Sequence, residues 1–160
     1  MINIITKKNT NHLTAGTNYG QHNLFHSYAS ASMAKGNLYN SVSFSHNTSE
    51  GFIENTDYKI NHLYYQGGIN DQRINIYWQA GLNQKAFGAN DFYSPSFPEQ
   101  YEETATGFGS FGFSTKGKIK LSGSGYWRRN NAHFLMRRND PSFYEIYHLT
   151  AIHGLRVIYN

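Results

Sequence analysis

Apolar and polar residues alternate one by one along several stretches of the chain. The clearest is RINIYWQAGLN (73–83), in which the even positions carry Ile74, Ile76, Trp78, Ala80 and Leu82. Successive side chains of a β-strand point to opposite faces, so this pattern predicts a strand between two unlike environments. Similar alternation occurs at 38–46, 119–127 and 146–159.

These stretches, with the turn residues between them, predict an all-β, antiparallel up-and-down meander of about eight strands. Tight connections at 34–37, 68–72 and 114–118 carry the Gly, Asn and Asp residues that hairpin turns favour. Long connections lie at 47–57, 86–104 and 129–144. The expected strands span residues 10–20, 23–34, 38–48, 57–68, 72–85, 104–114, 118–129 and 145–158.

The alternation of short and long connections is typical of outer-membrane barrels, which have short turns on one rim and long loops on the other. We therefore expect the meander to be part of a transmembrane β-barrel, or a small barrel of this kind. A soluble up-and-down barrel is the alternative, and its outer face would be charged. Here the polar positions hold mostly Ser, Asn, Gln, Thr and Tyr, which favours a water-filled interior.

Composition agrees with a sheet that meets two media. Aromatic residues make up 16% of the chain and charged residues only 15%, so the apolar surface rests largely on Tyr and Phe. The formal charge of +4 comes from scattered bases, without the basic stripe of a nucleic-acid-binding surface. We expect no nucleic-acid partner.

Neither catalysis nor metal binding is indicated. The chain has no cysteine, and its eight histidines form no HExxH motif. No nucleophile elbow or P-loop is present, and the sequence GFGSFGF (107–113) alternates like a strand. We predict no enzyme activity, catalytic residue, metal site or cofactor, and leave open a Ca²⁺ site among the loop carboxylates, which have no regular ligand spacing.

Aromatic residues are concentrated in the long connection AFGANDFYSPSFPEQYEET (86–104). Stiff, amphipathic side chains of this type suit ligand contact, and loops on a rigid scaffold frequently carry binding residues. The predicted ligand-binding residues are Phe92, Tyr93, Phe97 and Tyr101. Packing of these side chains against one another, to close the loop, is the alternative.

Two motifs resemble one protein family. INIITKK (2–8) resembles the segment that closes the plug domain of TonB-dependent outer-membrane receptors, although the usual Gly-Ala lead-in is missing. QKAFGANDFYSPSFPEQYEET (84–104) and YWRRNNAHFLMRRNDPSFY (126–144) are similar to barrel loops and flanking strands of the cobalamin-receptor-like branch.

The resemblance implies a fragment of such a receptor. Residues 1–9 would be the end of the plug and residues 10–160 the N-terminal portion of the barrel, in the outer membrane of a Gram-negative bacterium. The expected partners are outer-membrane lipid and a nutrient chelate such as cobalamin or a siderophore. TonB would be contacted only through the missing part of the plug. A complete small eight-stranded outer-membrane protein with an adhesion or structural role, and a soluble lipocalin-like binder, remain alternatives.

Overall fold

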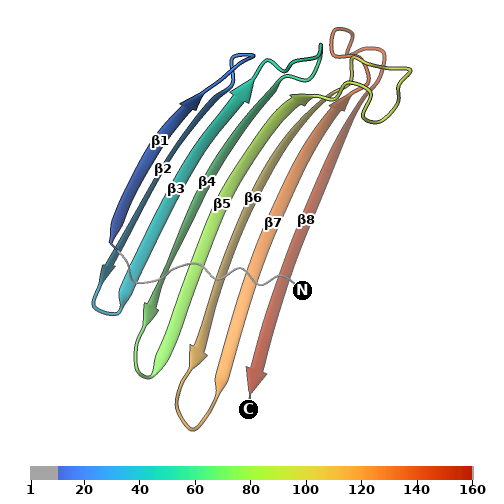
Figure 1. The fold of residues 1–160 in the computed structure, drawn as a ribbon. Coiled ribbons are helices and arrows are strands. Elements are labelled where there is room, and N and C mark those ends of the chain that lie inside the picture. Colours follow the sequence, from blue (N-terminus) through green and yellow to red (C-terminus); the bar gives the residue numbers. More distant parts are fainter. Residues whose placement is uncertain (1–10, 160) are drawn as a thin grey trace.

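A computed structural model describes residues 11–159, which form one antiparallel sheet of eight strands (Figure 1). The predicted eight-stranded meander is therefore confirmed, whereas the plug-like segment predicted at residues 1–9 lies outside the described residues. The strands are β1 (His12–Tyr19), β2 (Phe25–Lys35), β3 (Leu38–Ser49), β4 (Tyr58–Asn70), β5 (Ile74–Gly88), β6 (Tyr101–Thr115), β7 (Leu121–Leu135) and β8 (Glu145–Tyr159).

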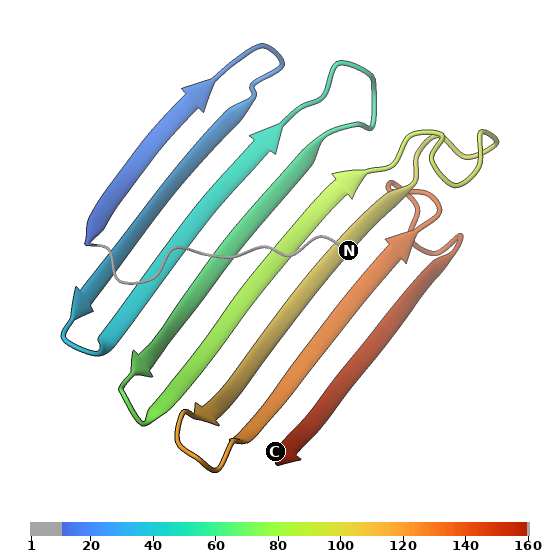
Figure 2. The same cartoon turned by 60° about the horizontal axis from the view of Figure 1, so that its bottom comes forward.

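Each strand pairs with its neighbours in the sequence, in the order β1 to β8. The strands bend along their length, and β1 and β8 are the two edges of an open sheet (Figures 1 and 2). The β2–β3, β4–β5 and β6–β7 turns lie on one rim, and the other four connections, which include the three longest, lie on the opposite rim, called here the loop rim (Figure 2). Within residues 11–159, no helix is long and apolar enough to cross a membrane.

Several strands extend further toward the loop rim than the alternation predicts. β7 reaches Leu135 rather than residue 129, and β6 begins at Tyr101 rather than residue 104. The apolar alternation stops near Trp127, but hydrogen-bonded pairing with β6 and β8 continues. At the opposite end Ile119, expected in a strand, lies in the turn, where its carbonyl accepts a hydrogen bond from Thr115 Oγ1 at 2.8 Å.

Cross-strand register sorts the side chains onto two faces. The apolar face contains Ile74, Ile76, Trp78, Ala80 and Leu82 of β5, together with their partners on the other strands. Those partners include Leu13, Val42, Phe44, Leu63, Ile69, Phe111, Phe113, Trp127, Leu155 and Val157. The polar face contains the alternate positions, such as Ser43, Gln66, Gln79, Ser110 and Ser124.

Aromatic rings on the polar face cover glycines on the neighbouring strand. Tyr39 pairs with Gly68, Tyr77 with Gly112 and Tyr126 with Gly154. A Cβ built on Gly68 would lie 2.5 Å from the Tyr39 hydroxyl, so the ring occupies the space that a side chain would need. The polar face therefore fills its own surface, which explains part of the glycine content of these strands.

Burial is scarce, because no second layer covers either face. Among the described residues the buried hydrophobic side chains are Tyr39, Ala89 and Leu135, and the latter two lie close to the loop rim. In contrast, Leu155 is 84% exposed and Leu13 81%. The sheet thus exposes apolar area that a water-soluble monomer would normally bury.

Candidate functional site

Three connections on the loop rim pack against one another: residues 50–57, 89–100 and 136–144. We call them together the loop unit. Asn55 connects the first two loops, because its Nδ2 donates hydrogen bonds to the carbonyls of Pro98 (2.8 Å) and Gln100 (2.7 Å). Asn90 Nδ2 donates in turn to the Glu54 carbonyl at 2.8 Å. Asn55 has a φ of 56°, a left-handed conformation in which Asn is among the more common non-glycine residues.

Gln100 is the centre of this loop unit and is completely buried. Its Oε1 accepts a hydrogen bond from the Tyr93 N–H at 3.1 Å, and its Nε2 lies 3.6 Å from Met136 Sδ. Its backbone carbonyl accepts from the Ala89 N–H at 2.8 Å. A buried amide with its groups paired in this way holds the conformation of the loop around it.

An ion pair ties the third loop to the first. The Arg138 guanidinium donates hydrogen bonds to both carboxylate oxygens of Asp57, with Nη2 to Oδ2 at 2.8 Å. This hydrogen bonding holds the pKa of Asp57 below its ordinary value and outweighs the opposing effect of burial. The guanidinium also lies 4.3 Å from the Tyr101 ring centroid, while the Arg138 N–H donates to the Glu99 carbonyl at 2.8 Å.

The four predicted ligand-binding aromatics do not form one group. Phe92 and Tyr93 make an edge-to-face pair with ring centroids 4.7 Å apart, and Tyr93 packs on Phe134 at 5.3 Å. Phe97 instead packs on Phe143 of the third loop, with centroids 5.9 Å apart. Tyr101 begins β6 and lies beneath Arg138.

Phe92 and Tyr93 are the two of these aromatics that are open to solvent, with exposures of 74% and 54%. The Tyr93 hydroxyl donates a hydrogen bond to the Glu102 carboxylate, which raises the pKa of Tyr93 to about 12. Tyr93 is thus fixed by Glu102, Phe134 and Gln100, whereas Phe92 contacts a ring only at Tyr93 among the described aromatic pairs. The role of these rings in ligand binding stays a prediction.

A polar hollow of about 360 Å³ lies between the three loops and is distinct from the aromatic residues. It is lined by Glu54, Asn55, Asn90, Pro98, Glu99, Arg138 and Asn139. Asn90 Oδ1 is buried and accepts no hydrogen bond from the described residues. The carboxylate, amide and guanidinium side chains of this lining can both donate and accept hydrogen bonds, a property that the aromatic content of the loop did not predict.

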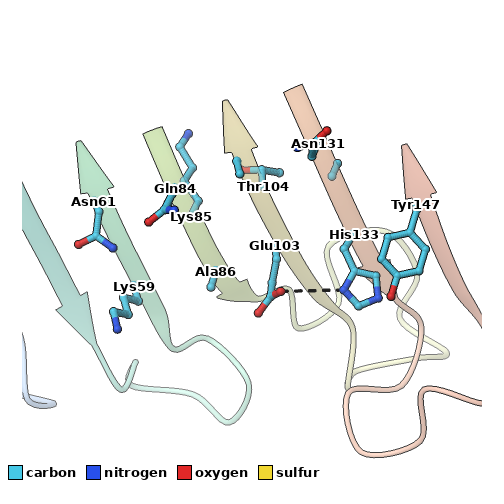
Figure 3. A pocket seen from close by; sticks show the side chains of 12 residues that line it. Lys59, Asn61, Gln84, Lys85, Ala86, Glu103, Thr104, Asn131, His133 and Tyr147 are labelled. Atoms are coloured by element: carbon cyan, nitrogen blue, oxygen red, sulfur yellow. Dashed lines mark ion pairs between the residues drawn. The ribbon is translucent and has the colours of Figure 1, made fainter. Parts of the chain in front are cut away.

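A second hollow, of about 480 Å³, lies next to the loops (Figure 3), on the same face of the sheet as the apolar side chains. Its side chains include Lys59, Asn61, Gln84, Glu103, Asn131, His133 and Tyr147. We did not predict this hollow, although the sequence contains a signal for it. At positions 84 and 131 the same alternating face changes from apolar to amide side chains.

His133 is the most contacted ionisable group of this second hollow. Its ring stacks on Tyr147 with centroids 4.2 Å apart and an interplanar angle of 3°. Nε2 lies 3.2 Å from Glu145 Oε2. Nδ1 lies 3.9 Å from Glu103 Oε2 (Figure 3). Within residues 11–159, no group of three or more His, Asp or Glu side chains is arranged to hold a metal ion.

Comparison of the chain with protein-family models, with curated proteins and with solved structures found no match.

Proposed function

We propose that this chain forms part of the wall of an outer-membrane β-barrel, with its apolar face toward lipid and its polar face toward a water-filled interior. The observation that carries the proposal is the uncovered apolar face of a one-layer sheet. Leu82 is 58% exposed, Phe111 52% and Val157 65%, although they lie within regular strands. Lipid tails can cover such a surface without a second protein layer.

The length of the apolar stretches supports a membrane location. On β5 they run from Ile74 to Leu82, and on β8 from Leu149 to Tyr159, where His153 interrupts the apolar side chains of that face. A tilted transmembrane strand needs about 9–11 residues, which both stretches provide. The pairs β5–β6 and β7–β8 are also in continuous antiparallel register, so their facing backbone groups are placed to hydrogen-bond to each other, as a bilayer interior requires.

We further propose that the barrel is that of a TonB-dependent receptor that takes up a nutrient chelate such as cobalamin or a siderophore. The resemblance of residues 84–104 and 126–144 to the cobalamin-receptor-like branch supports this. The packing of these two segments also supports it, since Gln100 contacts Met136 and Glu99 bonds Arg138. On this proposal the loop rim faces outward and meets the ligand.

The observation that favours the alternative of a complete eight-stranded outer-membrane protein is the strand number, because eight strands are enough to close a small barrel. The sheet is open between β1 and β8, as expected for a section of a wider wall. The soluble lipocalin-like alternative would instead require a cover for the exposed apolar face.

Because the chain contains no cysteine, single-cysteine variants test the membrane proposal directly. Leu155→Cys on the apolar face and Thr150→Cys on the polar face of β8 would be reconstituted in lipid vesicles. We expect a water-soluble maleimide to label the Thr150→Cys variant and to spare the Leu155→Cys variant until the vesicles are dissolved in denaturant. Equal labelling in intact vesicles would contradict a lipid-facing surface. A monodisperse monomer in detergent-free buffer would also contradict it and would favour the soluble alternative.

The receptor proposal requires a separate measurement of ligand binding. Cyanocobalamin would be added to the detergent-solubilised chain, and binding would be followed by equilibrium dialysis. Binding that is weakened by the double substitution Phe92→Ala and Tyr93→Ala, with the sheet intact by circular dichroism, would support the loop assignment. Equal binding by the wild type and the double variant would show that Phe92 and Tyr93 do not bind cyanocobalamin, and would favour the alternative that they pack within the loop.

A further inference from the structure

The apolar face changes character near the loop rim, where three consecutive cross-strand rows can be followed. The row furthest from the loops joins Leu63, Leu82, Gly107 and Arg129; its β4 and β5 positions belong to the apolar band, whereas its β7 position is charged. The next joins Asn61, Gln84, Ala105 and Asn131, and the one nearest the loops joins Lys59, Ala86, Glu103, His133 and Tyr147. Two polar rows therefore continue the same face directly above the apolar band.

These two rows form the walls and floor of the hollow of about 480 Å³ (Figure 3). Ala86 and Ala105 supply its low floor, because their side chains are the shortest in the two rows. Lys59 and Asn61 stand on the β4 side, while Glu103 of β6 and His133 of β7 stand on the other side (Figure 3). The hollow is thus a groove that adjoins the apolar band, since Asn61 and Gln84 are one row from Leu63 and Leu82.

Glu103 in the groove and Glu145 beside it already have partners. Glu103 Oε1 accepts a hydrogen bond from the Tyr101 hydroxyl at 3.0 Å, and Oε2 faces His133. Glu145 Oε2 accepts from the Tyr147 hydroxyl at 3.2 Å and also lies 3.2 Å from His133 Nε2. These contacts direct the negative charge of the groove toward its His133 side.

Lys59, on the opposite side, is exposed and makes no ion pair among the described residues. A free ammonium group is a strong donor for phosphate oxygens. The amides of Asn61, Gln84 and Asn131 also line the groove. Asn61 Oδ1 lies 2.7 Å from His46 Nδ1 and Asn131 Oδ1 accepts a hydrogen bond from Arg129 Nε at 3.3 Å, so these two amides offer mainly their N–H donors to a ligand. This combination suits a ligand that carries phosphate and several hydroxyl groups.

We infer that this groove binds the sugar-phosphate headgroup of a glycolipid whose acyl chains lie on the apolar band. Lys59 contacts the phosphate, and the three amides contact sugar hydroxyls. The acyl chains continue over Leu63 and Leu82, one row further from the loops. The inference rests on the proposed membrane location, since only a lipid-facing wall would present this groove to a headgroup.

The test uses the full chain and vesicles of phosphatidylcholine, either alone or with one added lipid. The added lipids are lipid A with its phosphates, the same lipid A after dephosphorylation, and phosphatidic acid. Flotation measures the preference for each vesicle. Fluorescence of Trp78 and Trp127, both on the apolar face, reports insertion independently.

The expected result is a preference for phosphorylated lipid A over both dephosphorylated lipid A and phosphatidic acid. Lys59→Gln should lower this preference about fivefold, the effect of one lysine near a charged lipid surface. Asn61→Ala combined with Gln84→Ala should reduce the preference over phosphatidic acid. Lys120→Gln, which removes the same charge at the opposite rim, is the control and should leave the preference unchanged.

Different failures have different meanings. Insertion into all vesicles with no lipid preference would overturn the headgroup site but leave the membrane proposal standing. Equal preference for phosphatidic acid, or competition by free inorganic phosphate, would reduce the groove to a simple anion site and also overturn the inference. Absence of insertion into any vesicle would overturn the proposed function itself.

Discussion

The two faces of the sheet differ in the chemistry of their exposed side chains, although their rings pack alike. Rings lie over glycines on both faces, Tyr126 over Gly154 on the polar face and Phe113 over Gly123 on the apolar face. Tyr126 is 53% exposed and Phe111 of the apolar face is 52% exposed. The Tyr126 hydroxyl can hydrogen-bond to water, whereas Phe111 offers no polar group. The comparison teaches that ring packing and exposure do not by themselves distinguish a water-facing surface from a lipid-facing one.

The largest expected effect comes from placing a charge on the face that needs lipid. Phe111→Arg would put a guanidinium near the middle of the apolar band, at a cost of about 2–4 kcal/mol in the free energy of unfolding from a bilayer. The measurement is urea unfolding of the vesicle-reconstituted chain.

The matched control is Ser110→Arg, one residue away on the polar face of the same strand. On the proposed function, this arginine would reach water inside the barrel. We therefore expect a much smaller loss of unfolding free energy than for Phe111→Arg. Similar losses for the two variants would remove the distinction between the faces.

A smaller effect should follow from a change in the self-packing of the polar face. Gly112→Ala would place a Cβ against the Tyr77 ring, and we expect it to cost about 1–3 kcal/mol, as overpacking generally does. Gly109→Ala, on the same strand, would meet no atom closer than 3.7 Å and should cost much less. Unfolding curves with the same midpoint for both variants would show that ring–glycine packing contributes nothing.

The loop unit depends on an ion pair rather than on either face. Asp57→Asn should lower the free energy of local opening of loops 50–57 and 136–144 by about 1 kcal/mol. The effect is modest because the ion pair is partly exposed and screened by water. Amide hydrogen exchange in these loops is the measurement. Asp91→Asn is a control at an exposed loop position that tolerates Asn and makes no described ion pair.

The same pair predicts a pH dependence. The pKa of Asp57 in the folded protein is below its ordinary value of 3.8, so its contribution is present above that value. The contribution is lost as the pH falls through the folded pKa, when the carboxyl binds a proton. Protection of the loop amides, measured relative to their intrinsic exchange rate at each pH, should fall under these acidic conditions in the wild type but not in the Asp57→Asn variant. Parallel profiles would indicate that another group controls the loops.

The smallest stability effect is expected at Phe92. This side chain is 74% exposed and packs mainly on Tyr93, so Phe92→Ala should change the unfolding free energy by less than about 0.5 kcal/mol. If the ring contacts ligand, cyanocobalamin binding should weaken severalfold. Phe52→Ala, which removes a ring of similar exposure from another loop, is the control and should bind like the wild type.

Much of the sheet could be predicted from the sequence. The alternation at 73–83 predicted β5 and assigned its side chains to two faces, and the turn residues predicted the hairpins. The ends of β7 could not be predicted from apolar alternation. Arg129, Asn131 and His133 continue the apolar face in register, but their side chains are polar. Backbone pairing there depends on β6 and β8, which a local pattern does not contain.

The candidate sites were predicted less well than the strands. The sequence drew attention to Phe92, Tyr93, Phe97 and Tyr101, but Gln100, the buried centre of the loop unit, has no local signal. The groove was also missed, because its row from Lys59 to Tyr147 takes one residue from each of five strands.

The sequence by itself determined the strands, the order of short and long connections, and the division into two faces. These features follow from the two-residue period of an extended backbone and from the conformational demands of turns, which are local properties. Only the tertiary structure decided that Asp57 meets Arg138, that Asn55 binds the Gln100 carbonyl and that Lys59 shares a row with His133. Such contacts join residues that are distant in the sequence. They depend on the register of every strand pair that lies between them and on the packing of separate loops, which a local sequence pattern does not contain.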